Sequence, residues 1–171
     1  NELKNIQSKY GTYFIVENHE YFHGVKPIID YVNSLGIKTL ENENIYIGEK
    51  DKGFYLCGVY DWFGNKYGSY QPDINKALEN TSNQPTILLA HQPKYITQLE
   101  TTKGIDLVLC GHTHGGQIFP FNFLVKLQQP YIKGLHTHNE FTQVYVNKGT
   151  GFWGPPMRLG ASSEITILKL S

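Results

Sequence analysis

Two histidines stand one residue apart in the segment 110–117, Cys-Gly-His-Thr-His-Gly-Gly-Gln. Neutral imidazole is a nitrogen donor and a common ligand of transition metals, so His112 and His114 are candidate metal ligands. The apolar run 105–109 before them predicts a buried strand, and the glycines predict a sharp turn at its carboxyl end. Glycine lets the backbone approach a ligand closely, so both imidazoles can be aimed at one point. The alternative is a polar loop that holds two unrelated histidines.

Two further apolar runs, 13–16 and 86–90, also end in polar side chains. These side chains are Asn18, His19, Glu20 and His91. A single histidine is more often a structural residue than a ligand, but three such strand exits in one small chain favour a metal site. In open α/β sheets, ligands bind at the carboxyl ends of the strands. We therefore expect the asparagine and histidine side chains at the three exits to converge on one crevice.

The elements that must position these residues alternate between strand and helix. Strands are predicted at residues 13–16, 45–48, 53–59, 86–90, 106–109, 143–147 and 164–170, and helices at 25–35, 73–79 and about 94–100. The second and third strands form a hairpin by their pattern. Interleaved strands and helices with hairpins indicate the α/β class (α+β by some schemes) with mixed sheets. By length, residues 1–171 are predicted to be a single domain.

Composition excludes several classes of function. Fifteen basic and fifteen acidic side chains cancel, and the absence of a lysine or arginine run argues against binding to long nucleic acid or to an anionic membrane surface. The 12 Tyr, 9 Phe and 2 Trp residues indicate a folded domain rather than disorder. Cys57 and Cys110 lie within apolar strand patterns, which predicts buried reduced thiols rather than a disulfide. No stretch reaches the roughly 18 apolar residues of a membrane span.

The ordered set of motifs resembles the calcineurin-like metallophosphoesterases, closest to the branch whose members often follow membrane segments. The resemblance rests on the motifs at residues 18–20, 89–93 and 111–118, extended by 146–151, 158–160 and 164–166. It implies a four-layer αββα sandwich with two mixed sheets. It also implies that the chain is the C-terminal part of such a domain, with the first strands missing.

The resemblance assigns the metal ligands. Asn18, His91 and His112 match ligands of one metal, and His114 matches a ligand of the other. The complete centre is expected to hold two divalent ions of the manganese, iron or zinc class. Such ions hold a water or hydroxide nucleophile between them and bind phosphate oxygens.

Two catalytic roles also follow from the resemblance. His19 matches the histidine that contacts the scissile phosphate and protonates the leaving oxygen, and imidazole suits this task near neutral pH. Glu20 is expected to orient His19 as a supporting carboxylate.

The chain departs from the family pattern in two places. Glu17 stands where the family has glycine before the asparagine, which puts the geometry at Asn18 in question. The Asp-x-His and Gly-Asp-x-x-Asp motifs of the family have no match before Asn18. Because those motifs supply the bridging aspartate, we expect this chain to bind at most one ion, weakly, and to be inactive or nearly so.

The sequence predicts a metal-dependent phosphohydrolase, acting on a phosphomonoester, phosphodiester or pyrophosphate bond, and present as a C-terminal fragment. The alternative is a non-catalytic or degenerate binding module. The expected substrate is a phosphorylated small molecule or a lipid-linked one, the latter favoured by the aromatic segment 119–124. Membrane association of the parent protein, at the cytoplasmic face or after export, is expected through an upstream segment. The apolar faces left by the missing strands are expected to be covered either by a homodimer or by the upstream part of the parent chain.

Several residues outside these motifs carry open alternatives. His23, His136 and His138 are expected at the surface or near the substrate rather than as ligands. Asp61 and Trp62 are expected either to line the groove or to be structural. Phe152, Trp153 and Arg158 are expected either to contact a substrate or to pack within the fold.

Overall fold

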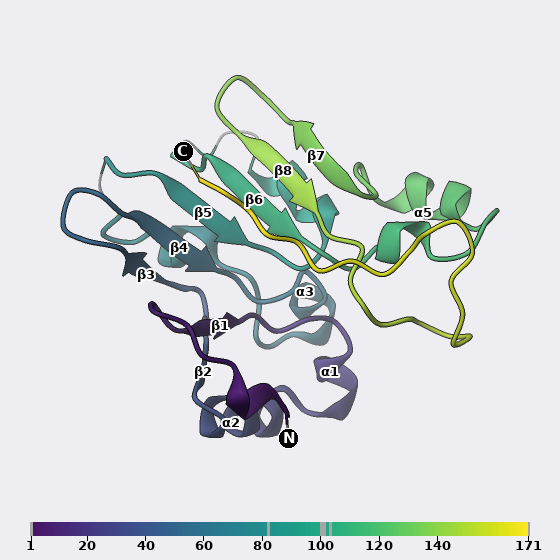
Figure 1. The fold of residues 1–171 in the computed structure, drawn as a ribbon, viewed down its shortest axis with the longest axis horizontal. Coiled ribbons are helices and arrows are strands. Elements are labelled where there is room, and N and C mark those ends of the chain that lie inside the picture. The colour runs from purple at the N-terminus through teal and green to yellow at the C-terminus, as the bar shows by residue number, and fades with distance from the viewer. Residues whose placement is uncertain (1, 82, 100–101, 103, 171) are drawn as a thin grey trace.

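A computed structural model describes residues 2–81, 83–99, 102 and 104–170. Its centre is a six-stranded sheet in the order β3-β4-β5-β6-β8-β7 (Figure 1). The strands are β3 (Glu43–Ile47), β4 (Phe54–Gly58), β5 (Thr86–Leu89), β6 (Leu107–Cys110), β8 (Gln143–Val146) and β7 (Gly134–Thr137). Strands β4, β5, β6 and β8 run parallel, and the antiparallel strands β3 and β7 lie at the two edges. The carboxyl ends of the four parallel strands therefore meet at one edge of the sheet.

The parallel strands are buried because alternate side chains on one face enter the main core. Leu88, Val108, Val144 and Val146 are fully buried there, together with the reduced thiol of Cys57. The helices that flank the strands are α3 (Gly64–Tyr67), α4 (Ile74–Ala77), η2 (Pro93–Gln98), η3 (His114–Gly116) and α5 (Asn122–Gln128). Side chains of α4 and η2 cover the core on this face of the sheet.

A smaller sheet packs against the other face. It pairs β1 (Thr12–Phe14) with β2 (Ile37–Thr39) in parallel, and the remaining elements are η1 (Glu2–Asn5), α1 (Glu20–His23) and α2 (Val25–Ser34). A Cβ atom on Gly58 of β4 would lie 2.5 Å from the Leu40 Cβ and 2.8 Å from the Ile15 Cγ2. This close approach requires glycine where the two sheets meet. Two sheets flanked by helices confirm the predicted α/β class and are consistent with the metallophosphoesterase sandwich.

The predicted helix at 94–100 is a 3₁₀ helix, η2, and position 100 lies outside the described residues. Pro93, Tyr95, Ile96 and Leu99 are buried, and the last three belong to the main core. The helices α1, α3 and α5 and the strands β2 and β7 were not predicted from the sequence.

The strand predicted at 164–170 is not formed. Figure 1 shows this C-terminal segment, in yellow, crossing the face of the large sheet rather than extending it. Glu164 and Thr166 face the sheet, where both contact the Tyr145 hydroxyl of β8. Ile165 and Ile167 point outward, with 86% and 94% of their surface exposed. A β-ladder requires a neighbouring strand whose backbone lies about 4.8 Å away. This segment is held to the sheet by side-chain hydrogen bonds rather than by such a ladder.

Candidate metal centre

A cavity of about 330 Å³ opens at the carboxyl ends of the parallel strands. The structure brings His19 and the four predicted metal ligands together around it. The lining side chains are Glu17, Asn18, His19, His91, His112, Thr113, His114, Phe121, Leu124, Val125, Gln128, Gln129 and Trp153. Glu20 is not among them. The helical spacing 121, 124, 125 and 128 is a sequence signal that could have identified α5 as a wall of this site.

Three donor atoms form a nearly equilateral triangle at the base of the cavity. The Asn18 Oδ1 lies 3.1 Å from the His91 Nε2 and 3.1 Å from the His112 Nδ1, and the two histidine nitrogens lie 3.2 Å apart. Ligand atoms about 2.0–2.1 Å from a tetrahedral zinc-class ion lie about 3.3 Å from one another. The spacing of this triangle therefore fits a shared divalent cation. Within the described part of the chain, no group of three or more His, Cys, Asp or Glu side chains has metal-site geometry, so the Asn18 amide is essential to the set.

The backbone of the double-histidine turn is held in an uncommon conformation. His112 and His114 both adopt positive φ, at 65° and 51°. The left-handed region costs a residue with a side chain roughly 1–2 kcal/mol. Surrounding contacts hold the turn: the Gly111 N–H donates to the His91 carbonyl at 3.0 Å, and the buried Thr113 hydroxyl donates to the Ile132 carbonyl at 2.6 Å. Such strain at a functional site indicates that the surrounding contacts, which place the imidazoles, outweigh the preference of these residues for negative φ.

The surroundings keep two of these imidazoles neutral. Burial, reinforced by the positive charges of His91 and Lys94, lowers the pKa of His112 to about 3. Burial also lowers the pKa of His114, and the Arg158 charge acts in the same direction. A neutral imidazole offers a lone pair to a cation without first releasing a proton, so His112 is ready to bind metal near pH 7.

Glu17, which the sequence reading marked only as a departure, contributes directly to the site. Its Oε2 lies 3.1 Å from the His91 Nε2, and its Oε1 lies 3.0 Å from the His19 Nδ1. Burial opposes ionisation, but the hydrogen bonds and positive charges of these two histidines lower the pKa of Glu17 to about 2. Glu17 therefore adds a negative charge beside the amide and imidazole donors of the site.

The role expected for Glu20, orienting His19, stays a prediction, because in this structure the carboxylate in contact with His19 is that of Glu17. The Glu20 carboxylate accepts a hydrogen bond from the Glu17 N–H instead. Glu20 begins α1, where a carboxylate commonly turns back to satisfy an amide that precedes the helix. Glu17 makes the contact to His19 that was expected from Glu20. Burial, with a contribution from the Glu17 charge, raises the pKa of Glu20 to about 7.

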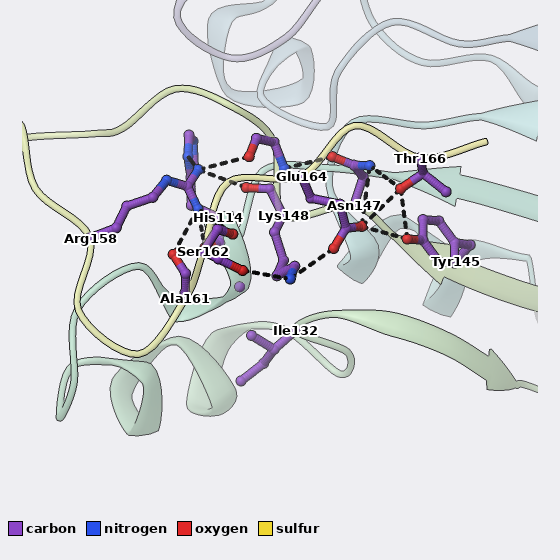
Figure 2. Close-up of polar contacts among 12 residues, drawn as sticks. His114, Ile132, Tyr145, Asn147, Lys148, Arg158, Ala161, Ser162, Glu164 and Thr166 are labelled. Atoms are coloured by element: carbon purple, nitrogen blue, oxygen red, sulfur yellow. Dashed lines mark hydrogen bonds and ion pairs between the residues drawn. The ribbon is translucent and has the colours of Figure 1, made fainter.

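His114 is positioned by a separate network of hydrogen bonds around Arg158, shown in Figure 2. The Arg158 Nη2 lies 3.2 Å from the His114 Nδ1. The same guanidinium donates to the carbonyls of Lys148 at 2.8 Å, Gly149 at 3.1 Å and Gly151 at 2.5 Å. Arg158 therefore orients His114 and fixes the loop that follows β8, and these contacts favour a packing role over contact with a substrate.

Four other candidate residues, His136, His138, Asp61 and Trp62, do not line the cavity. His136 is in β7 and stacks on Tyr131 at 4.6 Å, and the His138 Nδ1 lies 3.1 Å from the Tyr131 hydroxyl. His136 is partly buried in β7, and His138 follows the end of that strand. Asp61 is buried, accepts a hydrogen bond from the Gln92 Nε2 at 2.7 Å and does not line the cavity. Trp62 packs on the main core.

Comparison with known proteins is consistent with this geometry. A family model described as calcineurin-like phosphoesterase matches residues 2–116. An uncharacterized metallophosphoesterase of Helicobacter pylori (strain J99) is 52% identical, over 98% of this chain and 45% of the relative. The uncharacterized metallophosphoesterase Cj0846 of Campylobacter jejuni is 44% identical, over 99% of this chain and 44% of the relative.

More distant relatives extend the comparison beyond bacteria. A Bos taurus protein named transmembrane protein with metallophosphoesterase domain is 43% identical, over 98% of this chain and 40% of the relative. The chain thus spans less than half the length of these curated relatives. No solved structure matches the chain.

Proposed function

The chain belongs to the calcineurin-like phosphoesterase family, and we propose that it contributes the histidine-bearing half of a metal-dependent phosphohydrolase centre. The observation that carries this proposal is the donor triangle of Asn18, His91 and His112, whose edges measure 3.1–3.2 Å. Amide oxygen and imidazole nitrogen suit a manganese-, iron- or zinc-class ion.

Some residues of the site would bind the cations, and His19 would act on the substrate. Asn18, His91 and His112 would hold one divalent cation, and His114 would supply a ligand to a second. Bound cations of this kind polarise phosphoryl oxygens and activate water as a nucleophile. His19 lies at the exposed side of the cavity, where it can donate a proton to the leaving oxygen while Glu17 holds its Nδ1.

A dinuclear centre requires more carboxylate ligands than this cavity contains. We propose that the Asp-x-His and Gly-Asp-x-x-Asp motifs of a longer chain complete it, and that residues 1–171 alone hold at most one ion. The alternative is a degenerate module that binds a phosphorylated ligand without hydrolysis. The Glu17 carboxylate lies 3.1 Å from the His91 Nε2, and the Glu20 carboxylate accepts a hydrogen bond from a backbone amide.

Activity measurements on two proteins test this proposal. Residues 1–171 and the parent protein are compared for hydrolysis of bis(p-nitrophenyl) phosphate with manganese and with a chelator. We expect chelator-sensitive turnover in the parent protein and none above background in residues 1–171. Robust turnover by residues 1–171 would contradict the requirement for further ligands. An inactive, manganese-loaded parent protein would favour the binding module.

We further propose that the parent protein associates with a membrane, as the name of the Bos taurus relative indicates for that protein. No helix in the described part of this chain is long and apolar enough to cross a bilayer. Fractionation of cells that express the parent protein tests the proposal, because a protein found wholly in the supernatant after ultracentrifugation would contradict it.

A further inference from the structure

The cavity at the metal centre has a second, apolar wall that metal binding does not explain. Phe121, Leu124 and Val125 line it from α5 and its N-terminal side, and Trp153 lines it from the loop after β8. No residue of α5 is buried, and 56% of the Leu124 surface is exposed. An apolar surface inside a ligand-sized cavity usually meets an apolar part of a ligand.

The helix α5 is fixed at both ends to the turns that carry the histidines. At its start, a Cβ on Gly116 would lie 2.5 Å from the Asn122 Cβ, so glycine is needed for α5 to approach the double-histidine turn. At its end, the Gln129 Oε1 accepts a hydrogen bond from the Lys94 N–H at 2.9 Å, just after the His91 exit. The apolar wall is therefore built onto the metal centre as a fixed surface.

Trp153 is anchored to the same turn by Gln117. The Gln117 side chain is fully buried, its Nε2 donates to the Trp153 carbonyl at 2.8 Å, and its Oε1 accepts from the Trp153 N–H at 2.8 Å. The segment 112–117 thus presents two histidines to the cavity. The same segment packs against α5 at Gly116 and binds the Trp153 loop through the Gln117 side chain. One turn positions both the polar and the apolar parts of the cavity.

We infer that the site takes an amphiphilic phosphoester, with its phosphate at the donor triangle and an alkyl or acyl chain between α5 and Trp153. This inference rests on the proposed function and names its class of substrate. The residues that line the cavity include no lysine or arginine. A polyanionic group beyond the metal-bound phosphate would therefore lack counter-charges, whereas a hydrocarbon chain meets Phe121, Leu124 and Val125. Each buried methylene strengthens binding by roughly fourfold at most.

Fluorescence quenching tests chain placement directly. The Trp62→Phe variant leaves Trp153 as the sole tryptophan, and 12-bromododecyl phosphate is titrated below its micelle concentration with manganese present. Bromine quenches indole on contact, so we expect saturable quenching and binding at least tenfold tighter than that of ethyl phosphate. The matched Trp153→Phe variant, which retains Trp62 packed against the core and outside the cavity, should show no quenching. Equal affinity for the two phosphates would overturn the inference.

A pair of leucine variants on α5 separates chain binding from adsorption to a lipid surface. Leu124→Asp changes the wall, and Leu127→Asp changes an 82% exposed position outside the cavity. We expect Leu124→Asp alone to lower the ratio of dodecyl phosphate affinity to ethyl phosphate affinity tenfold or more, because this ratio cancels the effect of the added charge on the cation and on the phosphate. Equal effects of both variants, appearing only with phosphatidylcholine vesicles, would overturn the inference in favour of a membrane-contact surface.

Hydrolysis by the parent protein distinguishes this inference from the proposed function. Ethyl and dodecyl 4-nitrophenyl phosphate share a leaving group and differ only in the chain. We expect kcat/KM for the dodecyl ester to exceed that for the ethyl ester at least tenfold, and Leu124→Asp to remove the difference. Equal turnover of both esters would refute the inference and leave the proposed function standing. Quenching without any turnover would refute the proposed function and leave the amphiphile as a ligand.

Discussion

The Glu17 carboxylate lies 3.1 Å from the Nε2 of His91, at the spacing of two ligands of one metal ion. The other donors near His91, Asn18 Oδ1 and His112 Nδ1, are uncharged at neutral pH. A negative charge about 4 Å from a dication stabilises it by several kcal/mol at an effective dielectric constant near 20. Partial exposure of Glu17 reduces this contribution.

We therefore predict that Glu17→Gln weakens manganese binding by roughly tenfold, or about 1.4 kcal/mol. Isothermal titration calorimetry or the manganese EPR signal of residues 1–171 measures the affinity. Glu43→Gln on β3, which lies outside the cavity, serves as the control. Tighter binding by Glu17→Gln would show that the carboxylate competes with the cation for His91.

The positive φ of His112 makes a prediction about stability. Alanine is normally more stabilising than glycine by about 0.4–1 kcal/mol because it restricts the unfolded chain. At φ 65° the side-chain penalty of about 1–2 kcal/mol reverses that order. We expect His112→Gly to be more stable than His112→Ala by about 0.5–1 kcal/mol in urea unfolding, with manganese binding lost in both.

His91 provides the matched comparison, because it does not adopt positive φ. There the usual order should hold, with His91→Ala more stable than His91→Gly. The same order at both positions would contradict the assignment of strain to His112.

Asp61 predicts a dependence of stability on pH. Burial raises its pKa, and its Oδ2 has no hydrogen-bond partner among the described residues. The folded state therefore disfavours ionisation, and this penalty is absent below the unfolded pKa of about 3.9 and grows as pH rises toward the folded pKa. Relative to Asp61→Asn, the wild-type protein should lose unfolding free energy as pH rises from about 4. Urea unfolding of both proteins between pH 4 and 8 measures this difference, and a pH-independent difference would refute it.

Glu164 holds the C-terminal segment to the sheet through the Tyr145 hydroxyl and, at 2.9 Å, the Lys148 Nζ (Figure 2). These hydrogen bonds lower its pKa to about 2, so the contact is present above about pH 4.5 and is lost as pH falls through 2. We predict that Glu164→Gln increases hydrogen exchange of the residue-164 amide, which donates to the Gly149 carbonyl, by roughly threefold to tenfold. Lys169→Gln should leave this exchange unchanged. Unaltered exchange in Glu164→Gln would show that the backbone alone holds the segment.

The outward-facing Ile165 and Ile167 predict self-association of residues 1–171. Exposed apolar side chains on an extended segment recruit other chains. Sedimentation velocity should show a concentration-dependent dimer that Ile167→Lys shifts toward monomer. A monomer at every concentration tested, with the original sequence, would contradict the prediction.

Local pattern alone determined much of this protein. The spacing of Ile28, Ile29 and Val32 identified α2, and the alternation of turn and apolar residues identified the β3–β4 hairpin. The candidate ligands were recognised because each follows a buried strand, and strand exits are visible in a few consecutive residues. The strand predicted at residues 164–170 did not form because a β-ladder also requires a neighbouring strand. The pattern of one segment does not show whether such a neighbour exists.

Only the tertiary structure decided how the pieces meet. The 3.1 Å contact between Glu17 and His91 joins residues 74 positions apart, and no periodicity in either segment encodes it. The same holds for the hydrogen bonds between the Gln117 side chain and the Trp153 backbone, which join the double-histidine turn to a loop 36 residues later. Residue type and strand position are local properties, so the sequence reveals the ligands. The distances, the partner of His19 and the apolar wall arise from packing between distant segments, so they appear only when the chain is folded.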